Sequence, residues 1–274
     1  MTSTQKILVF SDIHLTSGGK KIIGLDPLKK LEAALDHALE NHGDAKHIIF
    51  SGDLAHDGDR LAYQSLKKVT NGINIPITFM MGNHDHRATF AQVFSSVGLD
   101  RDGFLQSRVC FGTHQLIFLD TLQHPSSSFN RNKGFLCSER LSWLDENLSA
   151  AKDKKVIIFM HHPAFPVEFK AMDQIRLVNS ESFLITLEKY QNVIHLISAH
   201  IHRTISGNFH GYGFSIFKST CHQMPMQCES DNVSLSAAEP GAYGILFLRP
   251  EGLIVHTEDF ELQERNKKIF NDYK

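Results

Sequence analysis

The chain has 274 residues, of which 42% are hydrophobic and 21% are charged, and its formal net charge is −2. This composition is typical of a globular protein, and the chain is long enough to bury a sizeable core. A protein that binds duplex nucleic acid usually carries a basic stripe, and this sequence has none, so we expect no nucleic-acid polymer as a partner.

The cysteines and the N-terminus bear on the cellular compartment, and both are typical of a cytoplasmic protein. None of the four cysteines lies in a C-x-x-C pair, and we expect free thiols in a reducing environment. The N-terminus runs directly into an apolar strand pattern and has no signal-peptide core. No apolar run approaches the roughly 20 residues of a membrane helix. We therefore expect a cytoplasmic protein that does not enter a membrane.

Strand and helix patterns alternate in the first half of the chain. Short apolar runs at 7–10, 47–50 and 76–81 predict strands, and helical spacing predicts helices at about 26–43, 59–69 and 88–97. Asp26 is expected to cap the first helix, with Pro27 in its first turn and Gly43 at its end. This alternation indicates βαβ units with parallel strands.

The second half begins with a hairpin pattern at 108–111 and 115–119, and Ser138 is expected to cap a helix through Leu148 that has Trp143 on its apolar face. A strand at 156–160, a helix at about 180–190 and a strand at 193–197 repeat the β-α-β order. Beyond Thr204 the pattern predicts antiparallel strands within 209–217, 243–248 and 253–260. The segments 123–134 and 225–240 are expected loops, which either cap a site or form an interface.

We find no tandem repeat and no linker, so we expect one domain over residues 1–274. The charged residues 262–274 are interpreted as a tail or a subunit contact.

Five predicted strands end in side chains that can bind a metal. Open α/β sheets place their sites at the carboxyl ends of their strands. Any one of these side chains alone is more typical of a polar turn than of a ligand, but the ordered set is a much stronger signal. Asp12 and His14 follow the first strand, Asp53 the second, Asn83 and His84 the third, His161 the fourth, and His200 and His202 the fifth.

Carboxylate, amide and imidazole donors together suit two divalent first-row cations, and Mn, Fe, Co and Zn all fit them. A carboxylate can bridge two such cations, which clamp a phosphoryl group and hold a hydroxide for in-line attack. His84 is placed to protonate the leaving alkoxide. The donor set therefore predicts metal-dependent phosphoryl chemistry.

From residue 7 to about 225, this ordered set of motifs resembles the calcineurin-like metallophosphoesterases. The resemblance implies an α/β fold, a four-layer α/β/β/α sandwich of two mixed sheets flanked by helices, with a dinuclear site. It implies that Asp53 bridges the cations and that His84 contacts the phosphate or protonates the leaving group. Asp12, His14 and His202 would hold one cation, and Asn83, His161 and His200 the other.

Within that family the chain looks most like bacterial class III cyclic-nucleotide phosphodiesterases and related glycerophosphodiesterases. The supporting residues are Arg87 after the Gly-Asn-His-Asp motif, the run 160–163 and the run 220–225. The resemblance implies that His222 lies near the substrate and that the protein is a homo-oligomer; the alternative for His222 is a polar turn between strands. One departure is Ala199, where the family usually has glycine, and alanine fits only with a negative φ.

The function we expect is hydrolysis of a small phosphodiester, a 3′,5′-cyclic nucleotide or a glycerophosphodiester, by a metal-bound hydroxide. A phosphomonoesterase or a nucleotide pyrophosphohydrolase on the same fold is the first alternative. A non-catalytic metal-binding scaffold is the second, since folds outlive their functions; the presence of all seven candidate ligands and His84 argues against it.

Overall fold

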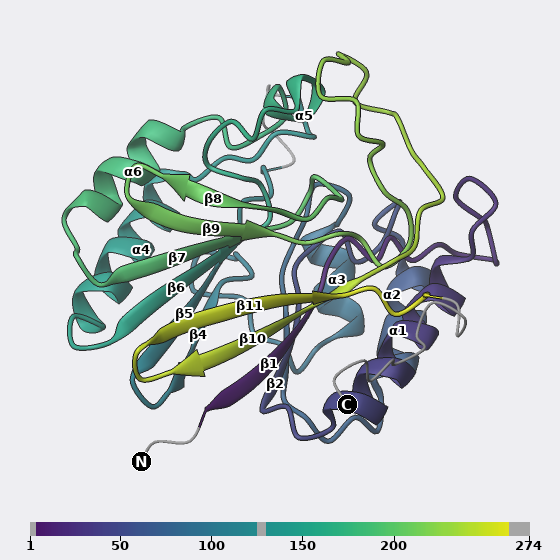
Figure 1. The fold of residues 1–274 in the computed structure, drawn as a ribbon, viewed down its shortest axis with the longest axis horizontal. Helices are drawn as coiled ribbons and strands as arrows, with labels where there is room; N and C mark the ends of the chain where they lie inside the picture. The colour runs from purple at the N-terminus through teal and green to yellow at the C-terminus, as the bar shows by residue number, and fades with distance from the viewer. Residues whose placement is uncertain (1–3, 125–129, 263–274) are drawn as a thin grey trace, which may run out of the picture.

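Two mixed β-sheets packed face to face form the centre of the molecule, and helices cover both outer faces (Figure 1). The computed structural model describes residues 4–124 and 130–262. This arrangement confirms the expected four-layer α/β/β/α sandwich. Three helices lie against the first sheet: α1 (Pro27–His42), α2 (Arg60–Thr70) and α3 (Arg87–Val93). Two lie against the second: α4 (Ser138–Ala150) and α6 (Ser180–Glu188).

The first sheet has the strand order β11-β10-β1-β2-β3. β1, β2 and β3 are parallel neighbours, whereas β10 pairs antiparallel with both β1 and β11. The third strand is shorter than the apolar run 76–81 indicated. The bounds are β1 Gln5–Phe10, β2 His47–Phe50, β3 Ile77–Phe79, β10 Tyr243–Arg249 and β11 Gly252–Glu258.

The second sheet has the order β4-β5-β6-β7-β9-β8. The expected hairpin of β4 and β5 is confirmed, as is the parallel pairing of β6 with β7. The prediction of antiparallel strands after Thr204 is wrong for one pairing of β9. This strand pairs antiparallel with β8, as expected, but it runs parallel to β7. The bounds are β4 Ser107–Phe111, β5 His114–Leu119, β6 Lys155–Met160, β7 Val193–Ser198, β8 Ile205–Phe209 and β9 Tyr212–Ile216.

Both faces of the central strands are buried, which explains why they read as continuous apolar runs. Alternate side chains of β1 point to opposite sides, so Ile7 and Val9 pack between the sheets. Leu8 and Phe10 pack under the helices. The same alternation in β6 places Ile157 between the sheets and Ile158 under α4 and α6. Strands buried on both faces therefore hold the loops at their ends in fixed positions.

The helices of the first half begin where the sequence indicated. Helix α1 (Pro27–His42) has Asp26 as its N-cap, whose carboxylate accepts from the backbone N–H groups of Leu28 and Lys29. Helix α2 (Arg60–Thr70) is capped by Asp59 in the same way. Helix α3 (Arg87–Val93) ends four residues before the expected boundary at residue 97.

Helix α4 (Ser138–Ala150) corrects one expectation. Cys137 holds the N-cap position, no side chain caps the helix, and the Ser138 hydroxyl instead donates to Glu139. Trp143 is partly buried against the apolar cluster below the helix, as expected. Helix α5 (Lys170–Asp173) is a single turn within an expected loop, and α6 (Ser180–Glu188) ends two residues early.

The connection between β9 and β10, drawn in yellow-green in Figure 1, extends beside α5. Lys170 at the start of α5 joins the two, through its backbone N–H to the Cys228 carbonyl and its ammonium to Asp231. The segment 225–240 contains no regular strand or helix, as expected. The prediction for 262–274 falls almost entirely outside the described residues, as does part of 123–134.

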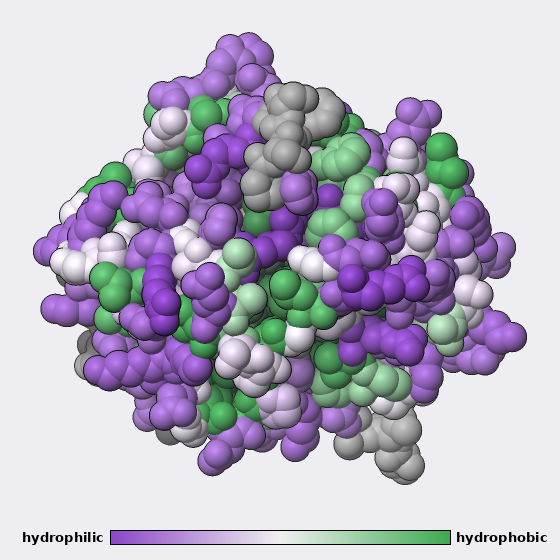
Figure 2. Space-filling view, turned by 180° about the vertical axis from the view of Figure 1, so that it is seen from behind, coloured by the Kyte–Doolittle hydropathy of each residue, from purple (hydrophilic) through white to green (hydrophobic). Residues whose placement is uncertain are grey.

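The face shown in Figure 2 is mostly hydrophilic, with hydrophobic residues in small groups. Among the described helices, none is long and apolar enough to cross a membrane.

Candidate metal centre

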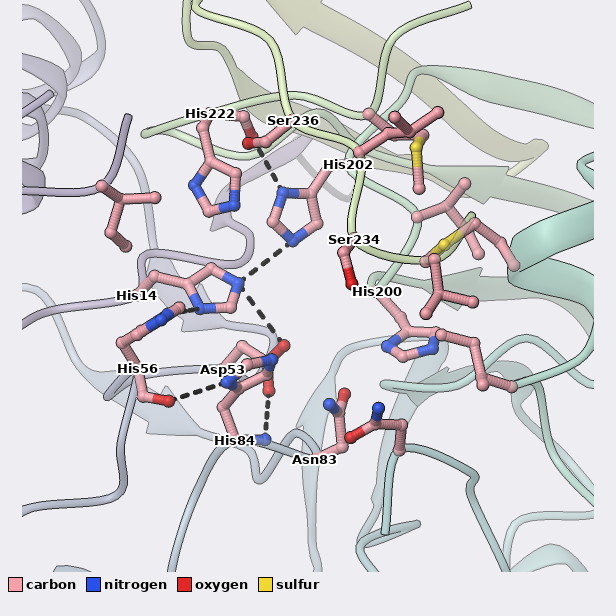
Figure 3. Close-up of a pocket in the computed structure, with 18 of the residues that line it drawn as sticks. His14, Asp53, His56, Asn83, His84, His200, His202, His222, Ser234 and Ser236 are labelled. Carbon is pink, nitrogen blue, oxygen red and sulfur yellow. Dashed lines mark hydrogen bonds and ion pairs between the residues drawn. The ribbon is translucent and has the colours of Figure 1, made fainter. Parts of the chain in front are cut away.

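The predicted site residues lie in loops that directly follow β1, β2 and β3 of the first sheet and β6 and β7 of the second. Because both sheets present the carboxyl ends of these strands to the same edge, residues far apart in sequence meet there (Figure 3). The structure brings the seven predicted ligands, His84 and His222 close together.

A first group combines two carboxylates and two imidazoles. One ligand atom from each of Asp12, His14, Asp53 and His202 lies within 4.8 Å of the others. The Nε2 atoms of His14 and His202 are 3.1 Å apart. Nε2 of His202 is 3.6 Å from Oδ1 of Asp12. These four side chains converge on a space of the size of one cation.

A second group lies on the other side of Asp53. Asn83 Oδ1 is 3.3 Å from His161 Nε2, and His200 shares a three-histidine group with His161 and His162. Oδ2 of Asp53 is 3.5 Å from Nε2 of His14 and 3.4 Å from Nε2 of His161. One carboxylate oxygen of Asp53 therefore faces both groups.

The two histidines placed near the substrate border these groups. The backbone N–H of His84 donates to Oδ1 of Asp53 over 2.9 Å, which places its ring beside His14. The His222 ring lies 5.0 Å from that of His14 and 4.7 Å from that of His202. Nδ1 of His222 is buried and meets no hydrogen-bond partner among the described residues.

Backbone carbonyls orient three of the site's imidazoles, those of His84, His161 and His202. When Nδ1–H donates to a carbonyl, the ring is fixed and its Nε2 lone pair is left for a ligand. This arrangement fits neutral imidazoles that bind a metal. Nδ1 of His161 pairs with the Ser51 carbonyl at 2.9 Å, Nδ1 of His202 with the His222 carbonyl at 2.8 Å, and Nδ1 of His84 with the His56 carbonyl at 2.7 Å.

Five of the candidate ligands have left-handed backbone conformations, which non-glycine residues adopt only at a cost. Such conformations cluster at functional sites because the surrounding fold must hold them in place. The φ angles are 49° at Asp12, 45° at His14, 49° at Asp53, 72° at His200 and 54° at His202.

The backbone also approaches these residues closely. A Cβ on Gly82 would lie 2.2 Å from Oδ1 of Asp53, so only glycine fits there. Ala199 is not among the residues with positive φ, and its N–H donates to the His161 carbonyl over 3.0 Å. Alanine therefore replaces the family's glycine without backbone strain.

The electrostatics of the site show a need for positive charge. Burial would lower the pKa of His161, but the carboxylates of Asp53 and Asp12 raise it to about 9. Burial, with a contribution from Asp53, raises the pKa of Asp12 to about 7. Two fully buried carboxylates surrounded by imidazoles thus attract a proton to His161. Divalent cations would supply that charge, so this donor set fits a metal centre.

A cavity of about 380 Å³ opens onto the two groups. Imidazoles and Asp53 form one side of it. None of the described lining residues is a lysine or an arginine. Apolar side chains complete the lining, most of them from long connections: Ile22, Ile23, Met172, Ile175, Met224, Val233 and Leu235.

Several lining residues were not predicted individually. Asn132 comes from the segment 123–134, and Ser234 and Ser236 come from 225–240. Both segments therefore border the site, one of the two roles left open above. His56 was also missed. The available signal was its position three residues after Asp53 in the same polar loop.

Comparisons with known proteins agree with this geometry. The model of the calcineurin-like phosphoesterase family matches residues 5–204. A probable cyclic nucleotide phosphodiesterase of Rhodopseudomonas palustris is 34% identical over 93% of this chain and 92% of its own. A glycerophosphodiester phosphodiesterase of Enterobacter lignolyticus is 28% identical over 81% and 79%.

The fold is also found in a dimetal phosphatase from Danio rerio, with a TM-score of 0.67 and 14% identity over 94% of this chain and 99% of that one. The family uses a dinuclear divalent metal centre. The family match covers more than half of the chain, and the most similar of these relatives spans nearly all of it. The chain therefore belongs to the calcineurin-like phosphoesterase family.

Proposed function

We propose that this protein hydrolyses small phosphodiesters at the site formed by Asp12, His14, Asp53, Asn83, His161, His200 and His202, and that cyclic nucleotides are its substrates. Two divalent cations, when bound, supply Lewis-acid stabilisation of the phosphoryl oxygens and a water molecule of lowered pKa. Asp12, His14 and His202 would hold one cation, and Asn83, His161 and His200 the other. Asp53, whose Oδ2 faces both groups, would bridge them.

The described lining of the cavity of about 380 Å³ contains no lysine or arginine, and this favours a diester; one arginine, Arg131, lines an adjoining cavity that also touches Asn83 and His84. A phosphodiester carries one negative charge, whereas a phosphomonoester carries close to two at neutral pH. Enzymes that neutralise a phosphoryl dianion commonly use arginine or lysine clamps in addition to metals. A cavity whose described lining has imidazoles but no cationic clamp is better matched to the monoanion.

His84 would act on the leaving group. The attacking water oxygen forms a new P–O bond, the ester P–O bond breaks, and the leaving alkoxide needs a proton. Because Nδ1–H of His84 donates to the His56 carbonyl, the proton given to the alkoxide would be a second one, carried on Nε2 of the imidazolium form, which returns to neutral imidazole on donating it. His222 borders the same space and would contact the substrate.

The apolar lining favours a cyclic nucleotide over a glycerophosphodiester. Ile23 and Val233, which are exposed, and Leu235, which is partly buried, offer an apolar surface on which a flat base can pack, and the buried side chains of Met172, Ile175 and Met224 lie behind it. The relative from Rhodopseudomonas palustris, which is named a probable cyclic nucleotide phosphodiesterase, supports this choice. The relative from Enterobacter lignolyticus keeps glycerophosphodiesters as the runner-up.

The first test compares bis-p-nitrophenyl phosphate with p-nitrophenyl phosphate, using protein stripped of metal and reloaded with manganese. We expect faster cleavage of the diester, and only after reloading. Faster cleavage of the monoester would move the assignment to a phosphomonoesterase. No cleavage together with no bound manganese would favour a non-catalytic scaffold.

A second test separates the two substrate classes. We expect Leu235→Asn to raise KM for cyclic AMP several-fold while leaving KM for glycerophosphoethanolamine unchanged. Ser230→Asn, in the same segment but outside the described cavity lining, serves as the control. An equal effect of Leu235→Asn on both substrates would contradict packing of a base against this surface.

The assembly and the compartment also belong to this proposal. A homo-oligomer would appear in light scattering coupled to size-exclusion chromatography as a mass that is a multiple of 30.9 kDa. A cytoplasmic location would appear on fractionation of the native host.

A further inference from the structure

The His14 imidazole is held in a different way from its neighbours. Nδ1 of His161, His202 and His84 each face a backbone carbonyl. Nδ1 of His14 instead faces Nδ1 of His56 at 3.3 Å. Figure 3 shows His56 beside His14, on the side away from His200. The orientation of the His14 ring is therefore set by a side chain, whereas the rings of His161, His202 and His84 are oriented by the main chain.

The direction of this hydrogen bond follows from the rest of the site. Nε2 of His14 points to Nε2 of His202 and Oδ2 of Asp53, so Nε2 must offer its lone pair to a ligand. Neutral His14 then carries its proton on Nδ1 and donates it. Nδ1 of His56 must be the acceptor, and His56 carries its own proton on Nε2.

The backbone holds His56 in the position that this bond requires. Its N–H donates to the Leu15 carbonyl over 2.9 Å, in the segment that follows His14. Its ring stacks on the His84 ring at 5.1 Å with an interplanar angle of 23°. Its carbonyl accepts from Nδ1 of His84. The acceptor is therefore fixed by contacts to both neighbouring segments.

We infer that His56 is a positioning residue that fixes the tautomer and the orientation of His14, and so tunes the affinity of one of the two metal sites. This inference rests on the proposed ligand set, in which His14, Asp12 and His202 hold the same cation. Partners of this kind typically change metal affinity by about 10–100-fold when they are removed. The effect should be confined to the His14 cation, because no hydrogen bond among the described residues joins the His56 side chain to Asn83, His161 or His200.

Two substitutions separate the hydrogen bond from the packing. His56→Phe keeps an aromatic ring to stack on His84 and keeps the backbone carbonyl, but it has no acceptor for His14. His56→Asn loses the ring and places an amide oxygen where Nδ1 was. A packing role and a hydrogen-bonding role therefore predict opposite orders for the two variants.

The experiment measures manganese binding to metal-stripped protein by equilibrium titration, with the bound stoichiometry checked by elemental analysis. We expect wild type to bind two equivalents per chain. We expect His56→Phe to weaken one of them by about 10–100-fold and to leave the other unchanged. His56→Asn should stay within about threefold of wild type at both sites, and thermal unfolding of the stripped proteins shows that each variant is folded.

The outcomes distinguish this inference from the proposed function. Failure of wild type to bind two equivalents would overturn both. Two equivalents in wild type, with His56→Phe unchanged or His56→Asn the weaker variant, would overturn the role of His56 alone. A third equivalent that both variants lose would also overturn it, because His56 would then be a ligand itself.

Discussion

The backbone N–H of His200 donates to both carboxylate oxygens of Asp12, over 3.0 and 3.2 Å, although the two residues are 188 positions apart. Asp12 follows β1 of the first sheet and His200 follows β7 of the second. The contact therefore joins the two sheets at the metal centre. Asp12 serves the fold as an acceptor and, in the proposed ligand set, serves the metal as an anion.

These two roles of Asp12 can be separated with Asp12→Asn, which keeps an oxygen acceptor but removes the charge. Burial raises the pKa of Asp12 to about 7, so its negative charge is unfavourable in the metal-free protein. We expect the stripped variant to be at least as stable as stripped wild type. Manganese should raise the melting temperature of wild type and not that of the variant.

Differential scanning calorimetry with and without manganese makes this comparison. Equal stabilisation of both proteins by manganese would contradict the assignment of Asp12 as a ligand.

Asp53→Ala is expected to remove metal binding and activity together. One oxygen of Asp53 faces both groups of ligands, so its loss affects both cations. Elemental analysis should find less than one bound metal per chain, and diester hydrolysis should fall to background. Asp57→Ala, at an exposed position in the same loop whose described ion pair is with Lys20, should keep both properties. Full activity of Asp53→Ala would disprove the two-metal assignment.

Sequence patterns predict the parts of this protein that follow the hydrophobic effect. β1 and β6 are buried on both faces, and their apolar runs predict both the strands and the edge where the ligands meet. Local rules fail where tertiary contacts decide. Ser138 has the chemistry of an N-cap, yet Cys137 takes that position.

The cavity shows the same limit. Ile23 and Met172 come from separate connections, and no local spacing relates them to each other or to the ligands. The left-handed conformations of Asp12 and His200 run against local preference and exist only because the fold imposes them. The ligands could be predicted because each follows a strand, whereas the apolar lining could not.

Arg87 supported the family resemblance, and the structure gives it a structural role. Its guanidinium forms two bonds of 2.6 and 2.7 Å to the buried carboxylate of Asp120. Arg87→Met leaves that carboxylate with only backbone donors, and we expect unfolding free energy to fall by about 3 kcal/mol or more. Two manganese ions per chain should still bind.

Arg101→Met is the matched control for urea denaturation, because Arg101 is 72% exposed and its loss should change stability by less than about 0.5 kcal/mol. Lost metal binding in a folded Arg87→Met variant would contradict a purely structural role.

His195 should make stability depend on pH. Burial lowers the pKa of His195 to about 4, and its Nε2 pairs with the Ser215 hydroxyl at 2.9 Å. Above a pH of about 6.5 the ring is neutral in both states. Below it the unfolded chain takes up a proton that the folded protein does not, so stability falls by up to about 1.4 kcal/mol per pH unit until about pH 4.

Urea denaturation of stripped protein between pH 7.5 and 5 measures this effect. We expect His195→Gln, which keeps a polar partner for Ser215, to lower the proton uptake on unfolding by about one relative to wild type. Identical pH slopes in the two proteins would contradict it.

The role of His84 can be resolved by varying the leaving group. A proton donor matters when the departing oxygen is a basic alkoxide and matters little for p-nitrophenolate, which is stable without a proton. We expect His84→Ala to bind two manganese ions, to lose about 10²–10⁴-fold in kcat on cyclic AMP, and to lose far less on bis-p-nitrophenyl phosphate. If His84 only contacted the phosphate, both substrates would lose activity equally.

His86→Ala, two residues along and outside the described ligand groups, should leave both rates unchanged. Equal losses on the two substrates would therefore assign His84 to phosphate binding and leave the proton to another donor.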